Sequence, residues 1–417
     1  METEELLHSI TTQLKYVGVE EIIEPEMVRP VAIKSQERKK LGNLEEQLRS
    51  AMESLKRDDR VPELLYKMGN VHFREGAFGN AILLYEQSLG LDSDRVDAWI
   101  QMGIAYYMGG EYSDAIKCLD TAIGIEPENS RALTYKGLAE LELNLLEQGK
   151  ANFDFAIKSD HTCCRAFLGV GLYYKKKGNL QGALQWMSRA RSVGTPSVTL
   201  YQEMAKIFVE QHEFEKAIAT LEDALTLDHE HPYVHALLGD IHVLKKSFDK
   251  AAHYYEKAVS VKFDDPKLWI KKGDIHRNMR SYQQAANSYE KAIHADPERV
   301  EAWVKNGQIS LLLDEQDLAL EYFNTALALE PDNPEVAHQR GLVYYSTGRL
   351  EEALDDFDSA FAHEPDNPHH LYFRAMILEK LERATEAKRT WQVAADLFRD
   401  LHDDTKAAEC SARAKRL

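Results

Sequence analysis

Cysteine, long apolar runs and catalytic motifs are scarce or absent in this sequence of 417 residues. The four cysteines form no CxxC pair and lack the density of a disulfide-rich secreted domain. A reducing compartment is therefore expected, and we assign the chain to the cytoplasm. No run of about 18 apolar residues is present, and the first residues do not resemble a signal peptide, so neither membrane spanning nor secretion is expected.

Basic residues are also in deficit. Lysine and arginine number 51 against 69 acidic residues, which gives a formal net charge of -18. This balance opposes binding to the phosphate backbone of a nucleic acid and mildly favours basic partners. Hydrophobic residues make up 44% of the chain, so apolar material for a core is plentiful.

The sequence does contain a repeat of 34 residues. The pentapeptide EPDNP occurs at 330–334 and again at 364–368. Positions 34 residues apart that begin at Gly69, Ala81 and Ser88 form three series of ten, and all thirty positions hold a small residue. The period continues without insertion over residues 62–401, which predicts ten repeats: 62–95, 96–129, 130–163, 164–197, 198–231, 232–265, 266–299, 300–333, 334–367 and 368–401.

Each repeat has the pattern of two helices. In 300–333, Trp303, Gly307 and Leu311 recur on one helical face, and Ala319 and Phe323 recur on a second. Small residues at the shared registers let two helices approach at the short end of the usual 8–10 Å. The link between the helices carries a glycine in four repeats, where a helix end favours a left-handed residue: Gly76, Gly110, Gly178 and Gly348.

EPDNP fits the junction between repeats. Pro331 stands just beyond a second helix, where the chain does not continue helically. Asn333 is expected to cap the next helix, and Pro334 suits the first helical position because no N–H is needed there. Asn367 and Pro368 are expected to act in the same way.

These residues resemble the tetratricopeptide repeat (TPR) family over residues 62–401. The matching positions are Trp99, Gly103, Tyr106, Ala115, Ala122 and Pro127, and again Trp303, Gly307, Ala319, Phe323, Ala326 and Pro331. The resemblance implies an all-α fold, a right-handed superhelix (an α-solenoid) of antiparallel helix pairs. It also implies that the first helices line a concave groove and that the protein binds other proteins or peptides.

The flanks differ from the repeats. Residues 1–34 are expected to be an N-terminal extension that is partly extended, and residues 35–61 a capping helix or half-repeat. Residues 402–417 are expected to be a polar C-terminal capping helix, with Asp404 as its N-cap.

Histidines are concentrated in HEHPYVH, residues 229–235. His231 and His235 are four residues apart, a spacing that can hold a metal. His235 nevertheless occupies the repeat position of Trp99 and Trp269, and His242 occupies that of Tyr106, so we favour packing. We expect no catalytic residue, no metal and no cofactor.

If the first helices line a concave groove, as the TPR resemblance implies, the residues that face this groove are the candidate binding residues. In repeats two to four these residues are apolar: Ile100, Ile104, Tyr107, Leu138, Leu168 and Leu172. In repeats six to nine they are polar: Asp240, Lys271, Asp274, Lys305, Gln308 and Gln339. Packing between neighbouring first helices is the alternative for the apolar set, and ion pairs between repeats, such as Asp274 with Lys305, are the alternative for the polar set. An exposed apolar groove would need a cover, either a partner helix or peptide or the segment 17–33 of the same chain.

One known family pattern is incomplete. TPR domains that hold acidic chaperone tails use a lysine with an asparagine four residues on. Asn70 fits, but Tyr66 stands where the lysine belongs, and Gln101 and Tyr135 replace later members of the set.

The sequence therefore predicts a non-enzymatic protein–protein interaction scaffold that binds a peptide or helix of a partner in the concave groove. No nucleic acid or membrane partner is expected. The alternatives are a regulatory subunit of an enzyme complex and a self-associating structural solenoid.

Overall fold

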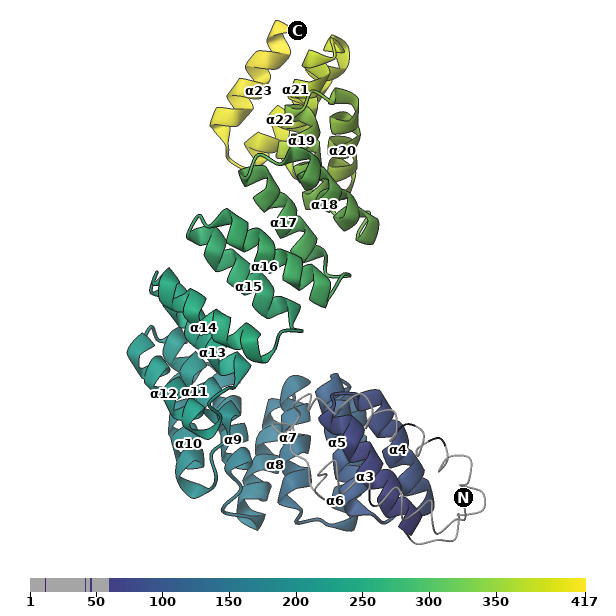
Figure 1. The fold of residues 1–417 in the computed structure, drawn as a ribbon, viewed down its shortest axis with the longest axis vertical. Helices are drawn as coiled ribbons and strands as arrows, with labels where there is room; N and C mark the ends of the chain where they lie inside the picture. The colour runs from purple at the N-terminus through teal and green to yellow at the C-terminus, as the bar shows by residue number, and fades with distance from the viewer. Residues whose placement is uncertain (1–11, 13–41, 43–45, 47–59) are drawn as a thin grey trace. The chain divides into compact units, whose positions relative to one another are not determined.

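A computed structural model describes residues 12, 42, 46 and 60–417, and the regular secondary structure of this part is entirely α-helical (Figure 1). Its helices α3 to α23 form ten consecutive pairs and one last helix. The expected all-α fold with about ten repeats is confirmed. Nearly all of the extension 1–34, with the whole segment 17–33, and nearly all of the proposed cap 35–61 lie outside the described residues. No helix of the described part is long and apolar enough to cross a membrane.

The chain divides into two compact units, Met1–Asp228 and His229–Leu417. In the described part of the first unit, five first helices alternate with five second helices. They are α3 (Arg60–Arg74), α4 (Phe78–Leu91), α5 (Val96–Gly109), α6 (Tyr112–Ile125), α7 (Ser130–Glu142), α8 (Leu146–Ser159), α9 (Cys164–Lys176), α10 (Leu180–Val193), α11 (Val198–Glu210) and α12 (Phe214–Leu227).

The second unit continues the alternation and ends on an additional helix. Its helices are α13 (Pro232–Leu244), α14 (Phe248–Val261), α15 (Pro266–Asn278), α16 (Tyr282–Ala295), α17 (Val300–Leu312), α18 (Gln316–Leu329), α19 (Pro334–Ser346), α20 (Leu350–His363), α21 (Pro368–Lys380), α22 (Ala384–Asp400) and α23 (Asp404–Arg416). Within each unit the two helices of a repeat pack more extensively on each other than on the next repeat, and α22 packs about equally on α21 and on the last helix α23.

The small residues of the repeat lie where the paired helices touch. A Cβ atom placed on Gly307 of α17 would stand 2.8 Å from Cε1 of Phe323 in α18, closer than real Cβ atoms come. A Cβ atom on Gly103 would stand 2.7 Å from Cγ of Leu119. The predicted close approach of the two helices is therefore confirmed, because a larger residue would force them apart.

The link between the two helices of a repeat is left-handed in all ten repeats. Gly76, Gly110, Gly178 and Gly348 have φ values between 76° and 84°, as their type predicted. The other six repeats place a residue with a side chain in this strained conformation, with φ between 56° and 63°: Asn144, His212, Lys246, Arg280, Asp314 and Glu382.

The junctions between repeats are capped as the EPDNP pentapeptides predicted. Asn333 Oδ1 accepts a hydrogen bond from Val336 N at 3.1 Å, and Asn367 Oδ1 accepts one from His369 N at 3.1 Å. Pro334 and Pro368 are the first residues of α19 and α21. The expected cap of the last helix is wrong by one residue, because Asp403, not Asp404, accepts the hydrogen bond from Lys406 N.

Candidate functional site

The polar candidate residues of the second unit contact one another across neighbouring repeats. Lys271 Nζ lies 2.7 Å from Asp240 Oδ2, and Lys305 Nζ lies 2.9 Å from Asp274 Oδ1. The first contact joins α13 to α15 and the second joins α15 to α17. The expected pair of Asp274 with Lys305 is confirmed, and four of the six polar candidates therefore connect repeats.

A buried tyrosine holds each of these carboxylates from the second helix. Tyr255 OH donates to Asp240 Oδ1 at 2.5 Å, and Tyr289 OH donates to Asp274 Oδ1 at 2.8 Å. Burial, followed by the adjacent aspartate, raises the pKa of both hydroxyls, so they stay protonated as donors. Asp240 and Asp274 each therefore bind a tyrosine within the repeat and a lysine of the next repeat.

Glycine makes room for these tyrosine rings. A Cβ atom on Gly239 would stand 2.6 Å from Cε2 of Tyr255, so the ring passes through space that only glycine leaves open. In the first unit Tyr85 reaches Asn70 in the same way, at 2.7 Å. This link was not predicted from the sequence, although its signal is visible there: tyrosine follows aspartate or asparagine by fifteen residues in these three repeats.

Lys305 and Gln308 line a cavity of about 350 Å³ on α17, bordered also by Glu301, Val304 and Glu335. A second cavity of about 350 Å³ adjoins it, because Glu335 lines both. The first helices α17, α19 and α21 thus present two consecutive cavities with carboxylate and amide groups. Gln339 lies half-buried on α19 and lines neither of them.

A histidine pair borders the second cavity. His338 Nδ1 and His370 Nδ1 are 2.9 Å apart, and His370 Nε2 lies 3.2 Å from Glu364 Oε2. When neutral His370 donates from Nε2 to Glu364, its Nδ1 accepts a hydrogen bond from the N–H of His338 Nδ1. Burial and the neighbouring His370 lower the pKa of His338 to about 4, so His338 is neutral at pH 7.

The apolar candidate residues of the first unit lie mostly within its core. Ile100, Ile104, Leu138 and Leu168 are at most 8% exposed, each within a hydrophobic cluster. Tyr107 and Leu172 are partly buried against the first of these clusters. The structure favours packing for these side chains, and ligand contact by them stays a prediction.

A cationic and aromatic group lies on the first helices α5, α7 and α9. Arg131 Nη2 donates to Gln101 Oε1 at 2.7 Å, and the guanidinium carbons of Arg131 and Arg165 lie 5.9 and 5.2 Å from the Tyr135 ring centroid. Arg165 was not among the candidate residues, because a single arginine in a repeat carries no sequence signal of its own.

The histidines of 229–242 have packing and capping contacts. His235 Nε2 lies 3.1 Å from the carbonyl oxygen of His229, six residues earlier, and Trp269 Nε1 donates to the carbonyl of Phe263 at the same interval. His231 caps α13, and His242 stacks on Tyr254 with ring centroids 5.4 Å apart. His235 therefore takes the structural place of a tryptophan, as its repeat position predicted.

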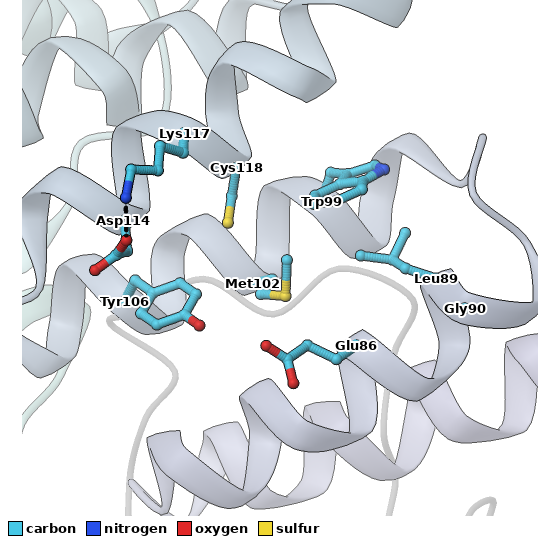
Figure 2. Close-up of a pocket in the computed structure, with 9 residues that line it drawn as sticks. All are labelled: Glu86, Leu89, Gly90, Trp99, Met102, Tyr106, Asp114, Lys117 and Cys118. Carbon is cyan, nitrogen blue, oxygen red and sulfur yellow. Dashed lines mark hydrogen bonds and ion pairs between the residues drawn. The ribbon is translucent and has the colours of Figure 1, made fainter.

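A further cavity, of about 390 Å³, lies between α4, α5 and α6 and was not anticipated from the sequence (Figure 2). Glu86 and Leu89 of α4, Trp99, Met102 and Tyr106 of α5, and Cys118 of α6 border it. The cavity is lined by residues of the second helices α4 and α6 and by the side of α5 that faces them. None of the predicted binding residues lines it.

Comparison with known proteins gives matches to three family models, each described as tetratricopeptide repeat. They match residues 72–138, then 203–266 and 270–334, then 308–378, together more than half of the chain. No curated protein sequence matches the chain.

The chain is also similar to solved structures. A tetratricopeptide repeat protein from Parabacteroides merdae has a TM-score of 0.50 at 19% identity, over 64% of this chain and 98% of that one. A chain of the APC/C hetero-tetramer Cut9-Hcn1 has a TM-score of 0.47 at 16% identity, over 73% of this chain and 59% of that one. This chain thus spans less than two thirds of that relative. Yeast Tom70 has a TM-score of 0.41 at 15% identity, over 86% and 96%.

Proposed function

Because this chain belongs to the tetratricopeptide repeat family, we propose that it is a non-enzymatic scaffold that binds a peptide or helix of a protein partner on its first helices. The observation that carries the proposal is the pair of adjoining cavities on α17, α19 and α21, with Lys305 and Gln308 in the first and the histidine pair in the second. Glu335 lies between them, so a single extended segment could contact both.

The lining of these cavities favours a polar segment. Glu301, Glu330 and Glu335 border the first cavity with Lys305 and Gln308, so both hydrogen-bond donors and acceptors face a ligand there. Lys305 already pairs with Asp274, which fixes its ammonium group in place before a ligand arrives. Asp240, Lys271 and Gln339 are proposed to extend this surface along the first helices of the second unit. The apolar set of α5, α7 and α9 is proposed as a separate contact surface of the first unit.

Site-specific photo-crosslinking tests this surface. A photoreactive phenylalanine analogue at Gln308, and separately at Gln339, is expected to capture a discrete partner from cells. The matched control carries the analogue at Asp317, an exposed residue of the second helix α18. Equal capture at Asp317 and at Gln308 would contradict binding on the first helices.

Two alternative functions use the same fold. A regulatory subunit would be recovered with an enzyme as the crosslinked partner, whereas a self-associating solenoid would be crosslinked to itself. Sedimentation of the purified chain separates the latter, since a scaffold for other proteins sediments as one chain. The net charge of -18 supports the further proposal that the partner is not a nucleic acid. We also propose that the protein has no membrane partner and acts in the cytoplasm.

A further inference from the structure

The cavity between α4, α5 and α6 combines an apolar wall with an acidic rim (Figure 2). Leu89 and Met102 are buried in its wall, and the partly buried rings of Trp99 and Tyr106 stand beside them. At about 390 Å³ it is large enough to hold a long side chain.

One carboxylate at this rim has no basic partner among the residues that the structure describes. Lys117 Nζ is bound to Asp114 Oδ1 at 2.8 Å, whereas Glu86 makes no ion pair within residues 60–417. Burial, together with the nearby carboxylates of Asp114 and Glu86, raises the pKa of the Cys118 thiol to about 12. The cavity lining carries two carboxylates, those of Glu86 and Asp114, against the single ammonium group of Lys117, so it would favour a further cation.

Other repeats show what fills the corresponding place. In four of them a basic residue follows an acidic or amide residue by sixteen positions and binds it. The pairs are Lys136 with Asp120 at 2.6 Å, Lys272 with Glu256, Arg340 with Asn324 at 2.7 Å, and Arg374 with Asp358. Sixteen positions after Glu86 the chain has Met102, which carries no charge.

Repeat 266–299 is the most informative internal counterpart, because it has a tryptophan, Trp269, at the position of Trp99 and a lysine, Lys272, at the position of Met102. The ammonium group of Lys272 lies 4.9 Å from the Trp269 ring centroid while it also contacts Glu256. Lys291 lies 4.6 Å from the same ring. A tryptophan face and a carboxylate in this arrangement therefore hold a lysine within the protein itself.

We propose that the cavity beside Met102 binds a lysine side chain of a partner protein. The ammonium group lies between the Glu86 carboxylate and the rings of Trp99 and Tyr106, and the methylene chain packs on Met102 and Leu89. The net charge of -18 attracts basic partners to the surface as a whole. This site is separate from the first-helix surface of the proposed function and does not depend on it.

Methyl NMR of the full chain labelled at its methionines tests the proposal. The probe is N-acetyl-lysine N-methylamide, and the comparison ligand is the norleucine derivative, which has the same apolar chain without the ammonium group. We expect the Met102 methyl signal to shift and saturate with the lysine derivative, with a dissociation constant on the order of 1 mM for so small a ligand. Equal shifts with the norleucine derivative would overturn the charge recognition.

Two variants and a control locate the binding. Glu86→Gln is expected to weaken it about threefold or more. Met102→Lys places an ammonium group of the chain itself at the position of Lys272, and we expect this variant to abolish binding. The methyl signal that disappears in this variant is that of Met102, so the variant also assigns the signal. Glu128→Gln removes the same charge from an exposed loop and should leave binding unchanged. Binding that survives in both Glu86→Gln and Met102→Lys would overturn the site. If the Met102 methyl signal shifts with protein concentration and not with added lysine derivative, the cavity binds a second copy of this chain, which would also overturn the proposal.

Discussion

The hydroxyl of Tyr289 donates a 2.8 Å hydrogen bond to Asp274, which simultaneously binds Lys305 of the next repeat at 2.9 Å. One carboxylate thus joins the second helix α16 to the first helices α15 and α17. Since stability in a repeat array accumulates from units and their interfaces, a contact that belongs to both affects folding and neighbour packing together.

Tyr289→Phe is expected to lower the free energy of unfolding by about 1 kcal/mol, because Asp274 loses a buried donor while the ring stays in place. Urea denaturation followed by circular dichroism measures the change. Tyr282→Phe in the same helix is the control, since no hydrogen bond of its hydroxyl is found among the described residues. Equal losses in the two variants would show that the Tyr289 hydroxyl contributes nothing.

Gly307→Leu is expected to destabilise the second unit by several kcal/mol, roughly 3 or more, because the side chain would occupy the space of the Phe323 ring. Thermal melting of the full chain measures the effect. In Gly124→Ala the new Cβ meets nothing within 4 Å, so that variant should be neutral or slightly stabilising. An unchanged melting curve for Gly307→Leu would contradict the helix pairing.

Glu382→Gly is expected to stabilise the protein by about 1 kcal/mol, since Glu382 has φ of 59° and glycine adopts this conformation without strain. Glu382→Ala removes the same side chain and keeps the strained backbone, so it serves as the matched control. Chemical denaturation of both variants gives the comparison. If alanine stabilises as much as glycine, the gain comes from the lost side chain and not from the backbone.

His338 gives part of the stability a dependence on pH. Its pKa is lowered from the ordinary 6.5 to about 4, so the unfolded chain binds a proton in this window more readily than the folded chain. Its contribution is therefore fully present above pH 6.5 and is lost as the pH falls towards 4. The loss is at most about 3 kcal/mol.

Denaturation of the wild type and of His338→Gln across pH 4 to 7 measures this contribution. The variant is expected to be less sensitive to acid over the window, because glutamine does not titrate. His369, His370, Glu335 and Glu364 lie near His338 and remain in both proteins, so the difference between the two profiles measures His338 together with its coupling to these groups. Parallel pH profiles for the two proteins would contradict the lowered pKa.

The sequence by itself determined the repeat, its two helices and their junctions. Gly307 and Phe323 recur at fixed places in the 34-residue period, and a close helix pair is a local consequence of that spacing. Asn333 and Pro334 act within one turn of the chain, so their roles as cap and first helical residue also followed from local chemistry.

The tertiary structure decided which side chains are buried and which meet across repeats. Ile100 and Ile104 belong to the hydrophobic core, a property that depends on neighbouring helices and not on periodicity. The left-handed link at Glu382 is imposed by the same packing, since glutamate does not favour it. The repeat period already places Met102 in the register of Lys272, but only the tertiary structure shows that Lys272 contacts both Glu256 and Trp269 there and that a cavity lies beside Met102.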